Sequence, residues 1–154
     1  MRIAHKVAIA IVVIIVALLA LLLPRSGHAD QTATFGDIVI RYSAISTDQL
    51  FAAVATRYKI ERSPHNGMVN ITVERKVAGA EATMIPAVVT GKVAELAGHA
   101  APIRFHESRD EGGIEYLGQF PIEASGTYVF TIEVTPVGRD VPYPVKFNRD
   151  YVLD

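Results

Sequence analysis

The sequence TYVFTIEVTP, residues 127–136, alternates between large apolar side chains and smaller or polar ones. The large apolar side chains, Tyr128, Phe130, Ile132 and Val134, would share one face of an extended chain. A period of two residues is typical of a strand with one buried face. Residues 127–136 are therefore predicted to form a β-strand whose inner face lies in the core.

Further strands are predicted on both sides of this one. They share an apolar pattern with period two and are bounded by Gly, Pro, Asn or Asp. They cover residues 34–45, 68–76, 87–96, 102–109, 114–120 and 143–152. Strands with almost no helix between them must pair mostly antiparallel. About seven strands in a chain of this size predict an all-β antiparallel sandwich, with a small barrel as the alternative.

One short helix is predicted between the first two strands. Ser46 and Gln49 have the spacing of a capping box at a helix start. Leu50, Val54 and Tyr58 then fall on one face of the helix that would follow.

The start of the strand at 127–136 resembles the tyrosine corner of immunoglobulin-like domains. In that motif a Tyr near the start of a strand bonds back to backbone a few residues upstream. Tyr128 has this place, and Phe130 stands where antibody domains carry a Cys. The motif predicts an immunoglobulin-like sandwich in which the Phe130 ring fills the space between sheets.

The first 29 residues have the pattern of an export signal. Arg2 and Lys6 precede the apolar run 7–23, and Gly27 and Ala29 are small residues at −3 and −1 of a cut after Ala29. The competing interpretation is an uncleaved anchor in the inner membrane, since residues 7–23 have the shortest length that can span a bilayer. Two regions are expected: the signal or anchor at 1–29, and one β-sandwich domain at 30–154. The domain would be periplasmic or secreted after cleavage.

Charge and cysteine content exclude several functions. Removal of residues 1–29 would change the net charge from −1 to about −4, and no basic patch remains, so nucleic acid is not an expected partner. The chain contains no Cys, which excludes thiol nucleophiles, disulfide exchange and Cys-ligated metals.

Metal ligands are scattered along the sequence. The candidates are His65, His99, His106, Met68 and Met84. No two of these histidines have a spacing that would place both on one face of a strand or helix. No metal or other cofactor is therefore expected, and a copper-type metal-handling protein using these His and Met residues is the alternative.

No catalytic residue is predicted, so the protein is not expected to be an enzyme. Acid–base pairs need two carboxylates in one pocket, and the acidic residues are either adjacent in a turn or spread over strands. They are Asp110, Glu111, Glu107, Glu115 and Glu123. The serines lack a Gly-x-Ser-x-Gly motif. They are Ser43, Ser46, Ser63, Ser108 and Ser125.

Recognition through a surface is the remaining possibility. The loops after Arg62 and Arg109 and the connection 137–144 occupy places where sandwiches carry binding residues. Edge strands can also accept a partner strand. An envelope protein is the expected partner, with no individual binding residue assigned.

Three stretches resemble a bacterial family known as domain of unknown function 4426. They are residues 34–37 with Tyr42 and Ser43, residues 58–63, and residues 67–71. The resemblance runs from about residue 35 to residue 151, and implies a short exported protein with an immunoglobulin-like sandwich and no assigned activity. Together these observations predict a non-catalytic accessory or binding module of the cell envelope.

Overall fold

A computed structural model describes residues 31–96 and 98–153 of the protein. The expected signal or anchor at residues 1–29 lies outside these ranges. Within them, no helix has both the length and the apolar character needed to cross a bilayer.

Strands dominate the described chain, and the strand pairings are antiparallel. The strands are β1 (Gln31–Phe35), β2 (Ile38–Ser46), β3 (Asn66–Arg75), β4 (Thr83–Met84), β5 (Ala87–Glu95), β6 (Ala101–Asp110), β7 (Gly113–Pro121), β8 (Gly126–Pro136) and β9 (Tyr143–Tyr151). A 3-10 turn (Thr47–Gln49) and the short helix α2 (Ala52–Tyr58) lie between β2 and β3. The predicted all-β antiparallel class with one short helix is confirmed for this part of the chain.

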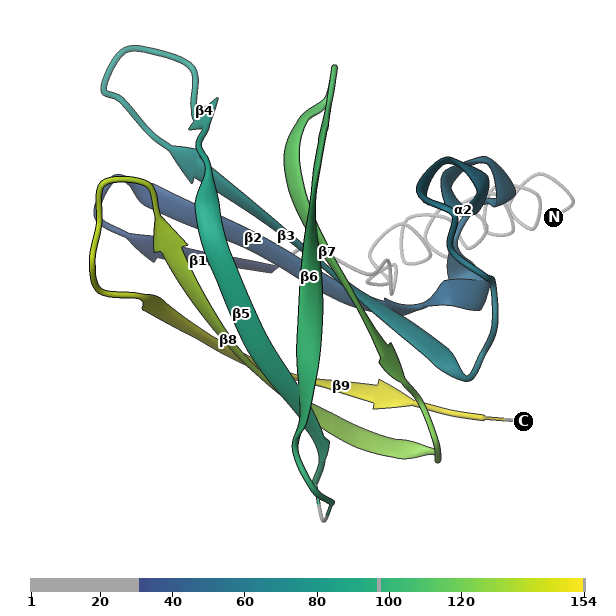
Figure 1. Ribbon diagram of the computed structural model, residues 1–154. Coiled ribbons are helices and arrows are strands. Elements are labelled where there is room, and N and C mark those ends of the chain that lie inside the picture. Colours follow the sequence, from purple (N-terminus) through teal and green to yellow (C-terminus); the bar gives the residue numbers. More distant parts are fainter. Residues whose placement is uncertain (1–30, 97, 154) are drawn as a thin grey trace, which may run out of the picture.

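The strands form one continuous sheet instead of two separate ones. Their order is β1-β2-β3-β7-β6-β5-β8-β9, with β4 added to β3. Strand β6 joins the two halves, since residues 101–103 pair with β5 and residues 104–110 pair with β7. The sheet curls so that β1, β2 and β3 lie across from β5, β8 and β9, and the result is nearly closed and barrel-like (Figure 1). The structure therefore has the two facing layers of the predicted sandwich and the nearly closed sheet of the barrel alternative, and the described residues form nine strands where about seven were predicted.

Two features account for the additional strands. The predicted strand 34–45 is a hairpin, because Gly36 has a φ of +63° and reverses the chain between β1 and β2. The two-residue strand β4 pairs with the end of β3. It is too short to have a recognisable period.

The inner face of β8 is the centre of the core, as its pattern predicts. Tyr128, Phe130, Ile132 and Val134 are all buried, and Phe130 has no exposed surface. The Phe130 ring stacks on Phe147 of β9, with ring centroids 4.7 Å apart. The same ring meets the edge of Phe120 of β7 at 5.0 Å. Phe130 therefore fills the space between the two layers, as expected.

The tyrosine corner is present. The Tyr128 hydroxyl accepts hydrogen bonds from the backbone N–H groups of Glu123 (3.0 Å) and Ala124 (3.3 Å). The same hydroxyl lies 3.2 Å from the Ala124 carbonyl and 2.9 Å from Glu95 Oε1, either of which can accept its proton. Tyr128 thus ties the connection between β7 and β8 to the last residue of β5.

The predicted capping box is wrong. The Ser46 side chain makes no helix cap, and its hydroxyl instead donates to the Ser63 carbonyl at 3.3 Å. Buried Thr47 bonds the same segment, donating to the Glu61 carbonyl and accepting from the Ser63 N–H. These hydroxyls hold the chain after α2 against the end of β2, because tertiary partners compete successfully with a local cap.

Gly67 is required for packing and not for a turn. The sequence 63–67 predicts a turn in which Asn66-Gly67 tolerates positive φ. The turn forms at residues 64–65, and Asn66 and Gly67 already begin β3 with no positive φ. A Cβ atom on Gly67 would lie 2.1 Å from Cζ of Phe120. The absence of a side chain therefore lets the far end of the Phe120 ring approach the backbone of β3 closely.

We expect Gly67→Ala to lower the free energy of unfolding by about 1–3 kcal/mol, because the added methyl group overpacks the core. Gly126→Ala is the matched control, since a Cβ there meets nothing within 4 Å. The control should be neutral or stabilising by less than about 1 kcal/mol. Urea unfolding measures both, and equal effects would show that the contact with Phe120 is unimportant.

We expect Tyr128→Phe to destabilise the protein by about 1–2 kcal/mol, because it removes the partner of two backbone donors. The ring and its packing remain. Tyr143→Phe is the control, since the Tyr143 ring also packs, on Phe35 at 4.3 Å, without a hydroxyl hydrogen bond in the described structure. Thermal unfolding followed by circular dichroism tests the pair, and a stable Tyr128→Phe would contradict the role of the corner.

Candidate functional site

A pocket opens where the end of β5 and the start of β6 approach the connection between β7 and β8. Its volume is about 350 Å³. The lining residues are Val93, Ala94, Glu95, Gly98, His99, Ala101, Pro121, Glu123 and Tyr128. The wall therefore combines apolar side chains with a few polar groups, as binding pockets commonly do.

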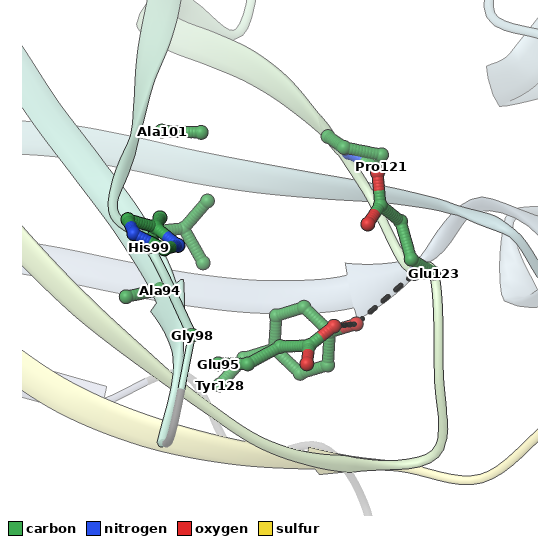
Figure 2. A pocket seen from close by; sticks show the side chains of 9 residues that line it. Ala94, Glu95, Gly98, His99, Ala101, Pro121, Glu123 and Tyr128 are labelled. Carbon is green, nitrogen blue, oxygen red and sulfur yellow. Dashed lines mark hydrogen bonds between the residues drawn. The ribbon is translucent and has the colours of Figure 1, made fainter.

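The polar groups come from three separate segments. Figure 2 shows His99 on one side of the pocket and Glu123 on the other, with the Glu95 carboxylate between them against the Tyr128 hydroxyl. Burial raises the pKa of Tyr128, and the Glu95 carboxylate raises it further, so the hydroxyl keeps its proton at neutral pH. Glu95 is thereby held in place, while Glu123 and His99 are exposed to solvent.

The chemistry of this lining favours a positively charged ligand. Two carboxylates and one imidazole line the pocket, and no Lys or Arg is among its lining residues. Carboxylates with no neighbouring cation attract ammonium and guanidinium groups and metal ions. The apolar wall of Val93, Ala101 and Pro121 would suit a ligand that carries an apolar part beside its charge.

A second group of polar side chains lies on the outer face of the sheet, beside α2. The Tyr58 hydroxyl donates to Glu115 Oε2 at 2.8 Å. Burial, together with this hydrogen bond, raises the pKa of Tyr58 to about 12. Arg57 forms an ion pair with Asp110 at the end of β6. These contacts fasten the helix to the sheet, and we assign them a structural role.

The candidate metal ligands are not brought together. His65 lies in the exposed turn before β3, and His106 points outward from β6. Met68 is buried beneath α2, and the Met84 sulfur accepts the Ile114 N–H at 3.4 Å. In the described parts of the chain, no group of three or more His, Asp or Glu residues is arranged to hold a metal ion.

The candidate carboxylates also lie apart, with one exception. Asp110 and Glu111 occupy the exposed turn between β6 and β7, and Glu107 pairs with Arg109. Glu115 is bonded by Tyr58, as described above. Glu123 is the one carboxylate among these candidates that lines the pocket, and the candidate metal ligand His99 lies on the other side of the same pocket.

The candidate serines are placed in strands and connections outside the pocket lining. The Ser46 hydroxyl donates to the Ser63 carbonyl, and the Ser63 N–H donates to the Thr47 hydroxyl. Ser125 bonds Leu153, and Ser43 and Ser108 are half-buried in β2 and β6. Two of the candidate loops make contacts of their own. The loop after Arg62 is held to Thr47 by a hydrogen bond from the Ser63 N–H. In the connection 137–144, the Arg139 guanidinium lies over the Tyr143 ring, 4.0 Å from its centroid.

The sequence analysis did not predict Glu95 as a site residue, and it did not predict the pocket that Glu95 lines. Glu95 pairs with Tyr128 in the register of β5 and β8, although 33 residues separate them. Nothing in the local sequence around Glu95 distinguishes it from any other strand-end Glu. Knowledge of the strand pairing would have found it.

Comparison with known proteins places the chain in a family. A family model described as domain of unknown function 4426 (DUF4426) matches residues 32–154. A DUF4426 family protein from Pseudomonas aeruginosa has a similar crystal structure, with 32% sequence identity and a TM-score of 0.67. The match covers 81% of this chain and 96% of that one. Among curated proteins, none matches the sequence.

More distant proteins share the fold. FetP from uropathogenic Escherichia coli strain F11 has 15% identity and a TM-score of 0.57, covering 80% of this chain and 94% of that one. A copper-bound variant of P19 from Campylobacter jejuni has 11% identity and a TM-score of 0.54, covering 79% of this chain and 94% of that one. The family model and the Pseudomonas structure together show that the chain belongs to the DUF4426 family.

Proposed function

We propose that the protein is a non-catalytic, exported binding module of the cell envelope, whose pocket takes a ligand with a cationic group. The observation that carries the proposal is the pocket lined by Glu95, Glu123 and His99, with no basic side chain other than the imidazole. A cation would approach Glu123 and the free oxygen of Glu95 and would leave its apolar part on the wall beside Pro121.

Export and an immunoglobulin-like fold belong to the same proposal. The basic start, apolar run and small residues before Asp30 support export to the periplasm or beyond. The tyrosine corner at Tyr128 supports the immunoglobulin-like description of the curled sheet. An envelope partner could present the cationic group, for example on a Lys or Arg side chain.

The state of the pocket carboxylates supports binding over catalysis. An acid–base pair requires two carboxylates in contrasting environments, so that one holds a proton and the other does not. Glu95 accepts a hydrogen bond from the Tyr128 hydroxyl, whereas Glu123 lies on the other side of the pocket and shares no hydrogen bond with Glu95 among the described residues. Two separate carboxylates on facing walls suit the attraction of a cation better than the sharing of one proton.

A metal-handling function is the second candidate, favoured by the fold. The P19 protein that shares the fold is copper-bound. Imidazole and carboxylate are ligands for Cu²⁺ and Zn²⁺, so His99 and Glu123 would be the residues to test. The segment that carries His99 would have to close over the pocket, because the present positions do not form a metal site.

Titration calorimetry with spermidine, arginine amide, Cu²⁺ and Zn²⁺ at constant ionic strength tests the proposal. We expect an organic cation to bind, and Glu123→Gln to weaken its binding about tenfold, because a charge-assisted hydrogen bond is lost. Glu133→Gln is the matched control, since Glu133 is exposed on β8 and does not line the pocket.

Three outcomes decide between the candidates. Loss of organic-cation binding in Glu123→Gln alone supports the proposal. Stoichiometric metal binding that His99→Ala abolishes, with no binding of organic cations, replaces it with metal handling. Equal weakening in both Gln variants, or no binding at all, contradicts a cation site in this pocket.

A further inference from the structure

Arg149 occupies an inward-facing position of β9. The side chains of Val145, Phe147 and Tyr151 alternate with exposed residues and point into the core, and Arg149 continues this series. Its Cα pairs with that of buried Tyr128 on β8, so the two side chains share one face of the sheet. A charged residue at a core-facing position requires a physical explanation.

The inward-facing guanidinium has donors with no acceptor. Arg149 Nε and Nη2 are buried and have no hydrogen-bond partner, and none of the ion pairs among the described residues includes Arg149. The hydroxyl of Tyr151, two residues along the same face, is also buried and unpartnered. Tyr151 is only 7% exposed. Three buried hydrogen-bond donors without partners therefore lie on one face of β9.

These buried donors lower the stability of the folded state unless an acceptor forms hydrogen bonds with them. A guanidinium cannot lose its proton at any ordinary pH, so Arg149 stays charged when buried. A buried donor without a partner destabilises the folded state, and a charged one does so more strongly. Burial raises the pKa of Tyr151 even though the Arg149 charge acts to lower it, so the hydroxyl also keeps its proton.

The pair of unpartnered nitrogens has a specific geometry. Nε–H and Nη2–H lie on the same edge of the guanidinium plane and point in parallel, which matches the two oxygens of a carboxylate or phosphate. The Tyr151 hydroxyl adds a third donor of the kind that oxyanions accept. A water molecule would accept from one of these donors at a time. An anion with two oxygens would accept from Nε–H and Nη2–H together and would neutralise the charge of the guanidinium.

The location provides a route to solvent. β1 and β9 are the two ends of the strand order, and the described residues show no pairing between them. Arg149 as a whole is half-buried, so part of its side chain reaches the surface although Nε and Nη2 do not. An anion could therefore reach the guanidinium along the open side of the sheet.

We propose that Arg149 and Tyr151 form an oxyanion-binding site at the open side of the curled sheet, with the Arg149 Nε/Nη2 edge as its bidentate donor. The ligand is a carboxylate or a phosphate group. This site is distinct from the pocket at Glu95 and Glu123, and has the opposite charge preference.

Thermal unfolding in Tris at one pH and one ionic strength tests the proposal, with acetate, succinate or phosphate replacing chloride. We expect a saturable rise in Tm of a few degrees with at least one of these oxyanions, because a ligand that binds only the folded state stabilises it. Arg149→Met should abolish the saturable part, and Tyr151→Phe should raise the half-saturating concentration several-fold.

The matched control is Arg104→Met, since Arg104 is exposed on the outer face of β6 and its response should equal that of the wild type. Comparison of the two Met variants removes the general stabilisation that phosphate gives to many proteins. The half-saturating concentrations of acetate, succinate and phosphate identify whether a carboxylate or a phosphate is the better ligand.

A second measurement does not depend on folding of the Met variant. The Arg149 Nε–H resonance of wild-type protein, assigned by its loss in Arg149→Lys, should shift saturably on addition of the same anion. No saturable effect in the wild type, or the same effect in Arg149→Met and Arg104→Met, would overturn the site and leave Arg149 as an uncompensated buried cation.

Discussion

The stacking of Phe130 on Phe147 and its edge contact with Phe120 is the interaction on which the rest of the structure depends. These rings come from β8, β9 and β7, so one buried side chain joins strands from both halves of the curled sheet. Burial of a Phe side chain contributes roughly 1.5–3 kcal/mol, and each aromatic pair adds about 0.5–1.5 kcal/mol. With no Cys in the chain, burial of this kind must hold the two layers together.

The same inner face of β8 organises both candidate sites. Tyr128 lies two residues before Phe130 and therefore points to the same side. Its ring packs against Tyr151 at 5.3 Å, while its hydroxyl meets Glu95 at the pocket. Glu95 on β5 and Arg149 on β9 thus pair with Tyr128 from its two sides, so the two proposed sites lie next to one buried tyrosine and differ in charge.

Most of the strands could be predicted because period two is a local signal. Residues 68–76, 87–96 and 127–136 each carry several apolar side chains in phase, and the observed strands end within two residues of the predicted limits. The hairpin at Gly36 was missed although the apolar phase shifts there by one residue, from Ala33 and Phe35 to Ile38 and Ile40. The capping box at Ser46 was wrong because the hydroxyls of Ser46 and Thr47 bond the distant segment 61–63, a competition that no local pattern reveals.

The sequence by itself determined the all-β class, the short helix, the buried face of β8 and the tyrosine corner, because each depends on residues that are neighbours along the chain. Tertiary structure alone decided that β6 would pair with both β5 and β7 and so make one curled sheet. It also brought both Glu95 and Arg149 beside Tyr128. Both placements follow from strand register, which is fixed by packing between residues far apart in sequence.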